Sequence, residues 1–367
     1  MASHFLYMVI LFFLVSGVVS CPPSDRNALL AIRSALSEPY LGIFSSWTGN
    51  NCCSNWYGVS CDPTTGRVAD ITLRGESEDP ILTRAGRTAG LMSGSISSSI
   101  CQLDRLSTLV LADWKQIGGP IPSCIATSLR WLRILDLPGN RLSGPIPSSI
   151  GHLSRLTVLN LADNLISGQI PRSLTSLSSL MHLDLSNNHI SGKIPQNFGD
   201  LKKLSRALLG RNQISGSIPA SIGYMNRLAD LDLAGNQISG EIPAYLGSMP
   251  VLSSLYLDGN QISGRIPAKL LQSKGLGILN LSRNAIEGSI PDVFDSKSYL
   301  MMLDLSYNHL TGHVPLTLAS AAYVGHLDLS HNHLCGTIPA VAPFDHLEAS
   351  SFESNDCLCG FPLAHCG

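Results

Sequence analysis

An α/β solenoid, a right-handed horseshoe of short repeats closed at both ends by disulfide-bonded caps, is the fold class that the sequence predicts. Three observations support it. An asparagine recurs every 24 residues, leucines alternate with polar residues ahead of it, and cysteines gather near both ends of the chain. In such an array each unit contacts only its neighbours, and stacking buries a continuous core.

The recurring asparagine sets the phase of the array. With small variations, nine copies share the unit L-x-x-L-x-L-x-x-N-x-[LI]-x-G-x-[IV]-P, and their asparagines are Asn140, Asn164, Asn188, Asn212, Asn236, Asn260, Asn284, Asn308 and Asn332. This unit and period are typical of leucine-rich repeats, which are about 20–29 residues long. The alternation of Leu231 and Leu233 with polar residues predicts a short strand with one buried face. Stacked copies should form a parallel sheet along the inside of an arc.

The other repeated positions predict the path of the chain after the strand. Asn236 should turn the chain, and its amide can both donate and accept hydrogen bonds, so a column of asparagines can bridge successive turns. Gly240 relaxes the backbone at the next bend, Ile242 enters the core and Pro243 restricts the chain beyond it. The motif is therefore scaffold, and we expect specificity in the residues that vary between copies.

The chain divides into four predicted parts. Residues 1–20 resemble a secretory signal peptide, because an apolar run ends in small residues before Cys21. Residues 21–66 and 335–367 are the expected caps. Residues 67–334 hold about 11 repeats, including degenerate ones: Trp114 and Lys115 stand where an asparagine is expected, and residues 76–90 form an unpatterned insertion. No later apolar run is long enough to span a membrane, so we expect a secreted, extracellular protein.

The ten cysteines are an even number, which in a secreted chain predicts disulfides. Their clusters lie where a solenoid needs caps to cover its apolar ends. The spacings CC and CLC lack the paired C-x₂-C of zinc sites, so no metal is expected. The cysteines are Cys21, Cys52, Cys53, Cys61, Cys101, Cys124, Cys335, Cys357, Cys359 and Cys366.

Several segments resemble known plant families. The front, "CPPSDRNALLAIRSAL", resembles the plant leucine-rich-repeat N-terminal cap, and "SFESNDCLCGFPLAHCG" resembles the C-terminal cap of secreted plant repeat proteins that include polygalacturonase inhibitors. "LRGESEDPI", "LVLADWK" and "PDVFDSKSYL" resemble the plant leucine-rich-repeat class labelled for DNA-damage repair and toleration. The resemblance implies the pairs Cys21–Cys52, Cys53–Cys61, Cys335–Cys357 and Cys359–Cys366, which leaves Cys101 and Cys124 as a fifth pair.

Charge and motifs limit the function. The chain has 24 basic and 26 acidic residues, and no basic stripe is apparent in the sequence, so nucleic acid is not an expected partner. A phosphate-binding G-x-x-x-x-G-K-[ST] motif is absent, and we expect no cofactor. No insertion in the regular repeats would form a catalytic pocket, so an enzyme is not expected. The repair and toleration label implies a DNA-damage-toleration factor, in plastids, as an alternative.

The variable position between the two strand leucines should face the concave side. Its column reads Asp136, Asn160, Asp184, Leu208, Asp232, Tyr256, Asn280, Asp304 and Asp328. The aspartates are either a solvated consensus of the repeat class or an acidic strip for a basic partner. Tyr256 and Leu208 interrupt the column and are the better recognition candidates, since aromatic anchors dominate many interfaces. Asp258 follows Tyr256, and Arg206 and Arg211 flank Leu208.

Two further features bear on this face. His182, His326 and His331 are candidates for a metal site, but they do not form a compact ligand set. Asn280 begins the sequon Asn-Leu-Ser, and a glycan there would obstruct part of the inner face. We therefore predict a non-catalytic protein that binds a protein, a cell-wall polysaccharide or enzyme, or a receptor kinase complex through its concave face. A polygalacturonase-inhibitor-like defence protein is the nearest alternative.

Overall fold

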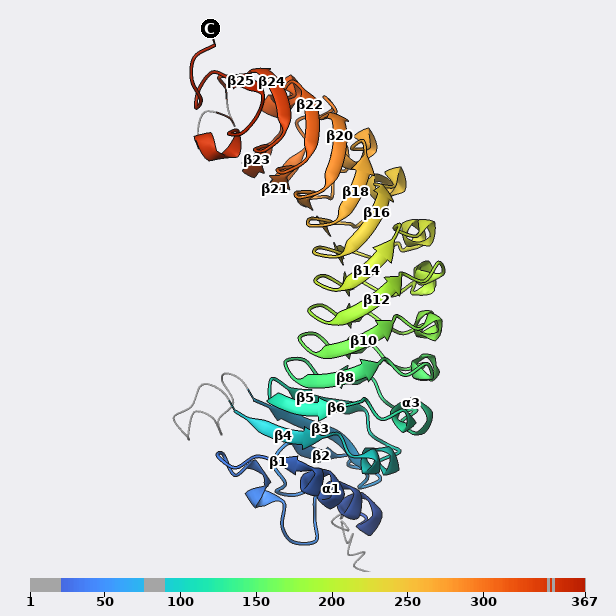
Figure 1. The fold of residues 1–367 in the computed structure, drawn as a ribbon. Coiled ribbons are helices and arrows are strands. Elements are labelled where there is room, and N and C mark those ends of the chain that lie inside the picture. Colours follow the sequence, from blue (N-terminus) through green and yellow to red (C-terminus); the bar gives the residue numbers. More distant parts are fainter. Residues whose placement is uncertain (1–20, 76–89, 342–343, 345–346, 367) are drawn as a thin grey trace, which may run out of the picture.

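A computed structural model describes residues 21–75, 90–341, 344 and 347–366. The described chain is a curved stack of coils with a cap at each end (Figure 1), so the leucine-rich-repeat solenoid is confirmed. The expected signal peptide, 1–20, and most of the insertion, 76–89, lie outside the described residues. None of the described helices has the length and apolar composition that a membrane span requires.

The predicted inner sheet lines the concave side. Its strands are parallel and in register in steps of one repeat, so that Leu231 pairs with Leu255, and both leucines are fully buried. Only β2 (Val59–Cys61) runs antiparallel, against β3 (Val68–Arg74). The remaining strands are β5 (Thr108–Ala112), β7 (Ile134–Asp136), β9 (Val158–Asn160), β11 (His182–Asp184), β13 (Arg206–Leu208), β15 (Asp230–Asp232), β17 (Ser254–Tyr256), β19 (Ile278–Asn280), β21 (Tyr299–Asp304) and β23 (Tyr323–Asp328).

A second sheet covers one flank of the solenoid, where the sequence predicted only a bend. Each of its regular strands buries one isoleucine or leucine, such as Ile238 in β16 (Gln237–Glu241), and then passes through a glycine; Gly240 has a φ of +84°. The other strands are β1 (Leu36–Ser37), β4 (Met92–Ser95), β6 (Lys115–Gly119), β8 (Arg141–Pro145), β10 (Leu165–Gln169), β12 (His189–Lys193), β14 (Gln213–Gly216), β18 (Gln261–Gly264), β20 (Ala285–Ser289), β22 (His309–Gly312), β24 (His333–Thr337) and β25 (Cys357–Cys359).

Short helices line the outer side of the arc (Figure 1). Most follow the repeated proline directly, as in η7 (Ala244–Ser248) after Pro243, because proline fixes φ at a helix-compatible value. The others are α3 (Cys124–Ser128), α4 (Ala268–Leu271), η2 (Ser98–Gln102), η3 (Ile150–His152), η4 (Arg172–Ser176), η5 (Phe198–Asp200), η6 (Ala220–Tyr224) and η8 (Leu316–Ser320).

The repeated asparagines form the expected ladder between coils. The Nδ2 of Asn236 donates to the carbonyl of Leu209 in the preceding coil, at 3.1 Å, and to two carbonyls of its own turn. Its Oδ1 accepts from the backbone N–H of Ile214, at 2.9 Å. Each amide therefore satisfies buried backbone groups of two coils, which explains its repetition.

The ladder ends at the irregular N-terminal repeat. Among the described residues, the buried Oδ1 of Asn140 has no hydrogen-bond partner. In the preceding coil Trp114 fills the place of the asparagine; it is fully buried, and its Nε1 donates to the carbonyl of Leu73 at 3.0 Å. A large apolar side chain thus replaces one amide at the start of the array.

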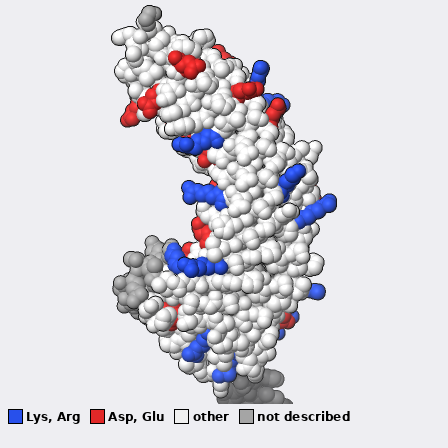
Figure 2. Space-filling view, viewed as in Figure 1, with Lys and Arg blue, Asp and Glu red and all other residues white. Residues whose placement is uncertain are grey.

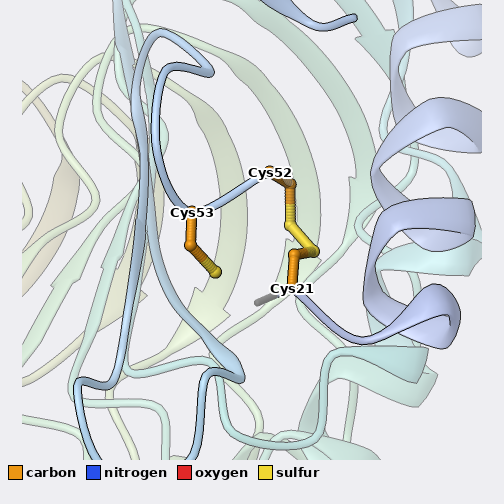
Figure 3. A group of neighbouring side chains, drawn as sticks. All are labelled: Cys21, Cys52 and Cys53. Atoms are coloured by element: carbon orange, nitrogen blue, oxygen red, sulfur yellow. A yellow bond between two sulfur atoms is a disulfide. The ribbon is translucent and has the colours of Figure 1, made fainter. Parts of the chain in front are cut away.

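Disulfides secure both caps and one coil junction. Around α1 (Pro23–Ala35) and η1 (Ile43–Ser46), Cys53 lies beside the bridge between Cys21 and Cys52 (Figure 3). This cluster is no metal site, because Cys53 is bonded to Cys61. The C-terminal cap contains η10 (Ala349–Ser351). The five bonds are Cys21–Cys52, Cys53–Cys61, Cys101–Cys124, Cys335–Cys357 and Cys359–Cys366.

Candidate ligand-binding face

The residues that the sequence places between the strand leucines form one continuous column on the inner sheet. Asp232 pairs in register with Leu208 on one side and with Tyr256 on the other, and Tyr256 pairs with Asn280. The same pairing links the rest of the column, from Asp136 through Asp184 to Asp304 and Asp328. Neighbouring members are thus one strand spacing apart, about 4.8 Å.

Most aspartates of the column support the turn that follows their own strand. Asp184 accepts from the N–H and the hydroxyl of Ser186, at 3.0 and 2.6 Å. Asp304 makes the equivalent pair of bonds with Ser306, and Asp328 accepts from the N–H of Ser330. These carboxylates therefore have a structural role in the repeat, in agreement with the consensus interpretation.

Asp232 departs from this pattern. The residue two positions later is Ala234, which offers an N–H at 2.9 Å but no hydroxyl. Burial raises the pKa of the Asp232 carboxyl, and the nearby charge of Asp184 raises it further. Its turn bond uses Oδ1 alone, as do those of Asp184 and Asp304, so Oδ2 of this half-buried carboxylate stays available to another partner.

Asp232 lies in a hollow of about 350 Å³ that also brings together Arg211, Tyr256, Asp258 and Asn280. Asp258 follows Tyr256 by two residues, but β17 ends at Tyr256 and Asp258 belongs to the following turn. The two side chains nevertheless line the same hollow. Its walls come from successive coils, which is why residues far apart in the sequence meet there.

The hollow is electrostatically unbalanced. Burial raises the pKa of the Asp258 carboxyl, as do the charges of Asp232 and Asp304, whereas Arg211 lowers it. The pKa of the Tyr256 hydroxyl is also raised, by burial first and then by the three neighbouring aspartates. Two carboxylates face one guanidinium, so a cation entering the hollow would relieve their repulsion.

The other predicted residues lie outside the hollow. Arg206 forms an ion pair with Asp230, 3.1 Å from Nε to Oδ2, and both groups are substantially exposed. Leu208 is half-buried in the column beside Asp232. Asp304 and Asp328 lie further along the column, next to their own turns.

Sequence reasoning missed why the hollow forms at this place. The position two residues after the strand is serine in several copies, but it is Gly210 and Ala234 around the hollow. A Cβ on Gly210 would lie 2.9 Å from both carboxylate oxygens of Asp232, so a side chain would not fit without a shift. The replacement of serine by Gly210 and Ala234 at this position was the signal in the sequence from which the hollow could have been predicted.

A basic edge lies beside the inner sheet, although the linear sequence showed no such stripe. Three residues before five of the inner strands, the side chain is exposed and basic or aromatic, with Ser179 interrupting the series before β11; these residues are Arg105, Trp131, Arg155, Lys203 and Arg227. The guanidinium carbons of Arg155 and Arg105 lie 3.8 and 5.1 Å from the Trp131 ring centre. Figure 2 shows acidic and basic groups close together along the inner edge of the arc.

The histidine candidates do not form a metal site within the described part of the chain. Burial lowers the pKa of His182, on β11. His326 lies on β23, but His331 lies in the turn after that strand and stacks on Tyr307 at 3.9 Å. Two larger hollows, of about 770 and 680 Å³, lie at the Ile-Pro segments near Lys193 and at the turns near Asn140. The smaller hollow is the better candidate because it lies on the concave column and contains Tyr256 and Asp258, which depart from the repeat consensus.

Comparison with protein families gives the same architecture. Residues 22–62 match the leucine rich repeat N-terminal domain, residues 120–280 match the leucine-rich repeat region and residues 274–334 match the leucine rich repeat. The N-terminal domain and the disulfides are typical of extracellular plant leucine-rich-repeat proteins.

Two curated relatives match parts of the chain. The DNA damage-repair/toleration protein DRT100 of Arabidopsis thaliana is 60% identical over 145 residues, which are 39% of this chain and 38% of the relative. A polygalacturonase inhibitor of Vitis vinifera is 34% identical over 117 residues, 32% of this chain and 30% of the relative. The chain thus spans only about a third of the length of either relative.

Solved structures match over a larger share. A plant ice-binding protein is 28% identical, with a TM-score of 0.72, over 95% of this chain and 99% of that one. The plant peptide hormone receptor RGFR1 in complex with RGF2 is 32% identical, with a TM-score of 0.62, over 72% of this chain and 46% of that one. A plant ice-binding protein and a plant peptide hormone receptor thus share this solenoid.

Proposed function

Because the chain is a plant leucine-rich-repeat protein with an N-terminal cap, related to the polygalacturonase inhibitors, we propose that it is a secreted, non-catalytic binding protein. Its proposed ligand is a protein or peptide segment with a basic side chain, bound at the hollow on the concave face. One observation carries this proposal: the hollow gathers two half-buried carboxylates, Asp232 and Asp258, beside the ring of Tyr256.

The chemistry of the hollow favours a basic segment. The charge of Asp232 raises the pKa of Asp258, and the charge of Asp184 raises the pKa of Asp232, so a positively charged group in the hollow would favour the charged form of both carboxylates. The ring of Tyr256 offers a rigid aromatic anchor and a face for a cation. RGFR1, a protein of related structure, is a receptor for a peptide hormone, which supports a peptide as the ligand class here.

Selection from a random-peptide display library would test this proposal. The wild-type protein, produced without N-glycans, is the bait, and peptides that also bind an Asp232→Asn/Tyr256→Ala double variant are removed. We expect the remaining peptides to be enriched in lysine and arginine and to lose binding at high salt, because the attraction is electrostatic. Recovery of acidic or uncharged peptides, or of peptides that bind both baits equally, would contradict the proposal.

A second candidate is recognition of an acidic cell-wall polysaccharide or of an acidic enzyme, in the manner that the name of the polygalacturonase inhibitors implies. The basic edge favours it, because Arg105, Trp131, Arg155, Lys203 and Arg227 are all exposed at equivalent positions. Titration with polygalacturonate, and a comparison with an Arg155→Ala/Arg227→Ala variant, tests it. Weak, salt-sensitive binding that the double variant loses would support this candidate.

The name of the DNA damage-repair/toleration relative suggests a third candidate. A titration with single-stranded DNA at several salt concentrations tests it. If the basic edge neutralised phosphates, binding would weaken strongly as the salt concentration rises. We expect no saturable binding of single-stranded DNA or of ATP. Micromolar ATP binding would favour the repair reading over both others.

A further inference from the structure

We propose that Asn280 is an N-glycosylation site whose glycan covers the hollow, so that the ligand reaches Tyr256 only on chains without this glycan. The inference rests on the proposed function, since it takes the chain to be secreted and the hollow to be its binding site. Three features of the structure carry it: the hydrogen bonds of Asn280, its place beside Tyr256 and its contrast with Asn160.

The amide of Asn280 is oriented for substitution on nitrogen. Its Oδ1 accepts from the N–H and the hydroxyl of Ser282, the third residue of the sequon, at 3.0 and 2.8 Å. Among the described residues its Nδ2 has no hydrogen-bond partner, and Asn280 lines the hollow. A sugar on Nδ2 would leave both bonds of Oδ1 intact, so the modified chain can keep this fold.

Asn160, at the equivalent position five repeats earlier, shows that this arrangement is not general. Its Nδ2 donates to Asp136 at 2.9 Å, and its Oδ1 accepts from the N–H of Ala162 at 3.1 Å. A substituent on Nδ2 there would compete with the bond to Asp136. Asn280 therefore combines the sequon with a nitrogen that the fold leaves unused.

The position of Asn280 determines what a glycan would cover. Asn280 pairs in register with Tyr256 on the adjacent strand, about 4.8 Å away, and both residues line the same hollow. A branched glycan is larger than a space of about 350 Å³, so it would fill the hollow and extend over the inner face. The presence or absence of the glycan would thus determine whether a ligand can reach the side chain of Tyr256.

The modification is a glycosyl transfer to the side-chain amide of Asn280. A bond forms between Nδ2 of Asn280 and the anomeric carbon of an oligosaccharide carried on a lipid pyrophosphate. The bond between that carbon and the pyrophosphate oxygen breaks, the lipid pyrophosphate leaves with the bonding electron pair, and Nδ2 releases one proton to solvent. Transfer occurs before the coil is packed, because Asn280 is half-buried in the folded chain.

The test compares the full chain, secreted from a eukaryotic host, with Asn280→Gln and Ser282→Ala, two different ways to remove the sequon. Peptide mass determines occupancy at Asn280, and nitration by tetranitromethane reports the access of reagent to Tyr256. Tyr224, which is 69% exposed in η6 on the outer side, is the internal reference. Ala162→Ser, which creates a sequon at Asn160 away from the hollow, is the matched control.

We expect a glycan on Asn280 of the wild type and several-fold slower nitration of Tyr256 than in either sequon variant, with equal nitration of Tyr224. A glycan that Ala162→Ser adds at Asn160 should leave the nitration rate of Tyr256 the same as in the wild-type protein. A secreted wild type without a glycan, or equal nitration of Tyr256 in all chains, would overturn the inference. The nitration test uses no ligand. Its outcome therefore does not depend on the outcome of the peptide selection, which tests the proposed function.

Discussion

The carboxylate of Asp25 and the guanidinium of Arg67 form an ion pair at 2.9 Å that ties α1 to the start of β3. The Asp25 side chain is fully buried and also accepts from the N–H of Val68 at 2.9 Å. The hydrogen bond to Asp25 raises the pKa of Arg67. Asp25 thus adds a buried polar link to the strand pairings β1–β4 and β2–β3 that join the N-terminal cap to the repeats.

Asp25→Ala should therefore destabilise the cap. Removal of the carboxylate leaves the buried N–H of Val68 without its acceptor, while Arg67 keeps its ion pair with Asp104, so the expected cost is about 1–3 kcal/mol. Chemical denaturation should show this loss, and hydrogen exchange should locate it in α1. Asp230→Ala, which breaks the exposed pair with Arg206, is the control and should cost less than about 1 kcal/mol. Equal effects of the two variants would show that the cap does not rely on Asp25.

The asparagine ladder predicts unequal effects of identical substitutions. Asn236→Ala removes hydrogen bonds from both amide atoms and leaves the N–H of Ile214 without its partner, at a cost of about 1–3 kcal/mol. Asn140→Ala should cost less, because its Oδ1 has no partner to lose among the described residues. Urea unfolding of both variants measures the difference. A larger loss for Asn140→Ala would mean that its donor bonds alone determine stability.

The sequence predicts what repeats and misses what depends on neighbouring coils. The 24-residue period located the inner sheet and the ladder because the same side chains carry out the same task in each copy. The flank sheet was missed, since a strand such as Gln237–Glu241 buries only Ile238 and shows no alternation. The hollow was missed because it depends on Gly210 and Ala234 meeting side chains of the next coils. Only stacking brings such residues together.

The raised pKa of Asp232 predicts how stability changes with pH. A raised folded-state pKa means that the folded chain holds this proton more tightly than the unfolded chain does. Below the unfolded-state pKa, about 3.9, both states are protonated and the group has no effect. As the pH rises from there through the folded-state pKa, the unfolded chain releases its proton first, and stability falls.

Asp232→Asn should remove this loss while keeping an oxygen for the N–H of Ala234. Melting temperatures should be measured from pH 3 to pH 7 for the wild type and for Asp232→Asn. They should coincide near pH 3, and that of the variant should be higher at pH 7. The exposed Glu241→Gln is the control and should show no such divergence. A variant that is less stable than the wild type at pH 7 would show that Asp232 is favourably paired when charged.

Tyr256→Ala should separate recognition from stability. Tyr256 is half-buried at the end of β17, and its neighbours are the charged groups of the hollow. Loss of an aromatic anchor should weaken binding of a selected basic peptide by about 1–3 kcal/mol, with little change in melting temperature. Tyr245→Ala is the matched control: its hydroxyl donates to the carbonyl of Pro219 at 2.7 Å on the outer side, and burial raises its pKa to about 12.

The control should lower the melting temperature and leave peptide affinity unchanged, the reverse of Tyr256→Ala. Calorimetric titration with the selected peptide, beside thermal unfolding of each variant, gives both quantities. Glu241→Lys, on the flank sheet, tests the opposite assignment, because it reverses an exposed charge without touching the inner face. If Glu241→Lys abolished binding and Tyr256→Ala did not, the ligand would have to bind the flank sheet, and the hollow would be a structural feature of the repeats alone.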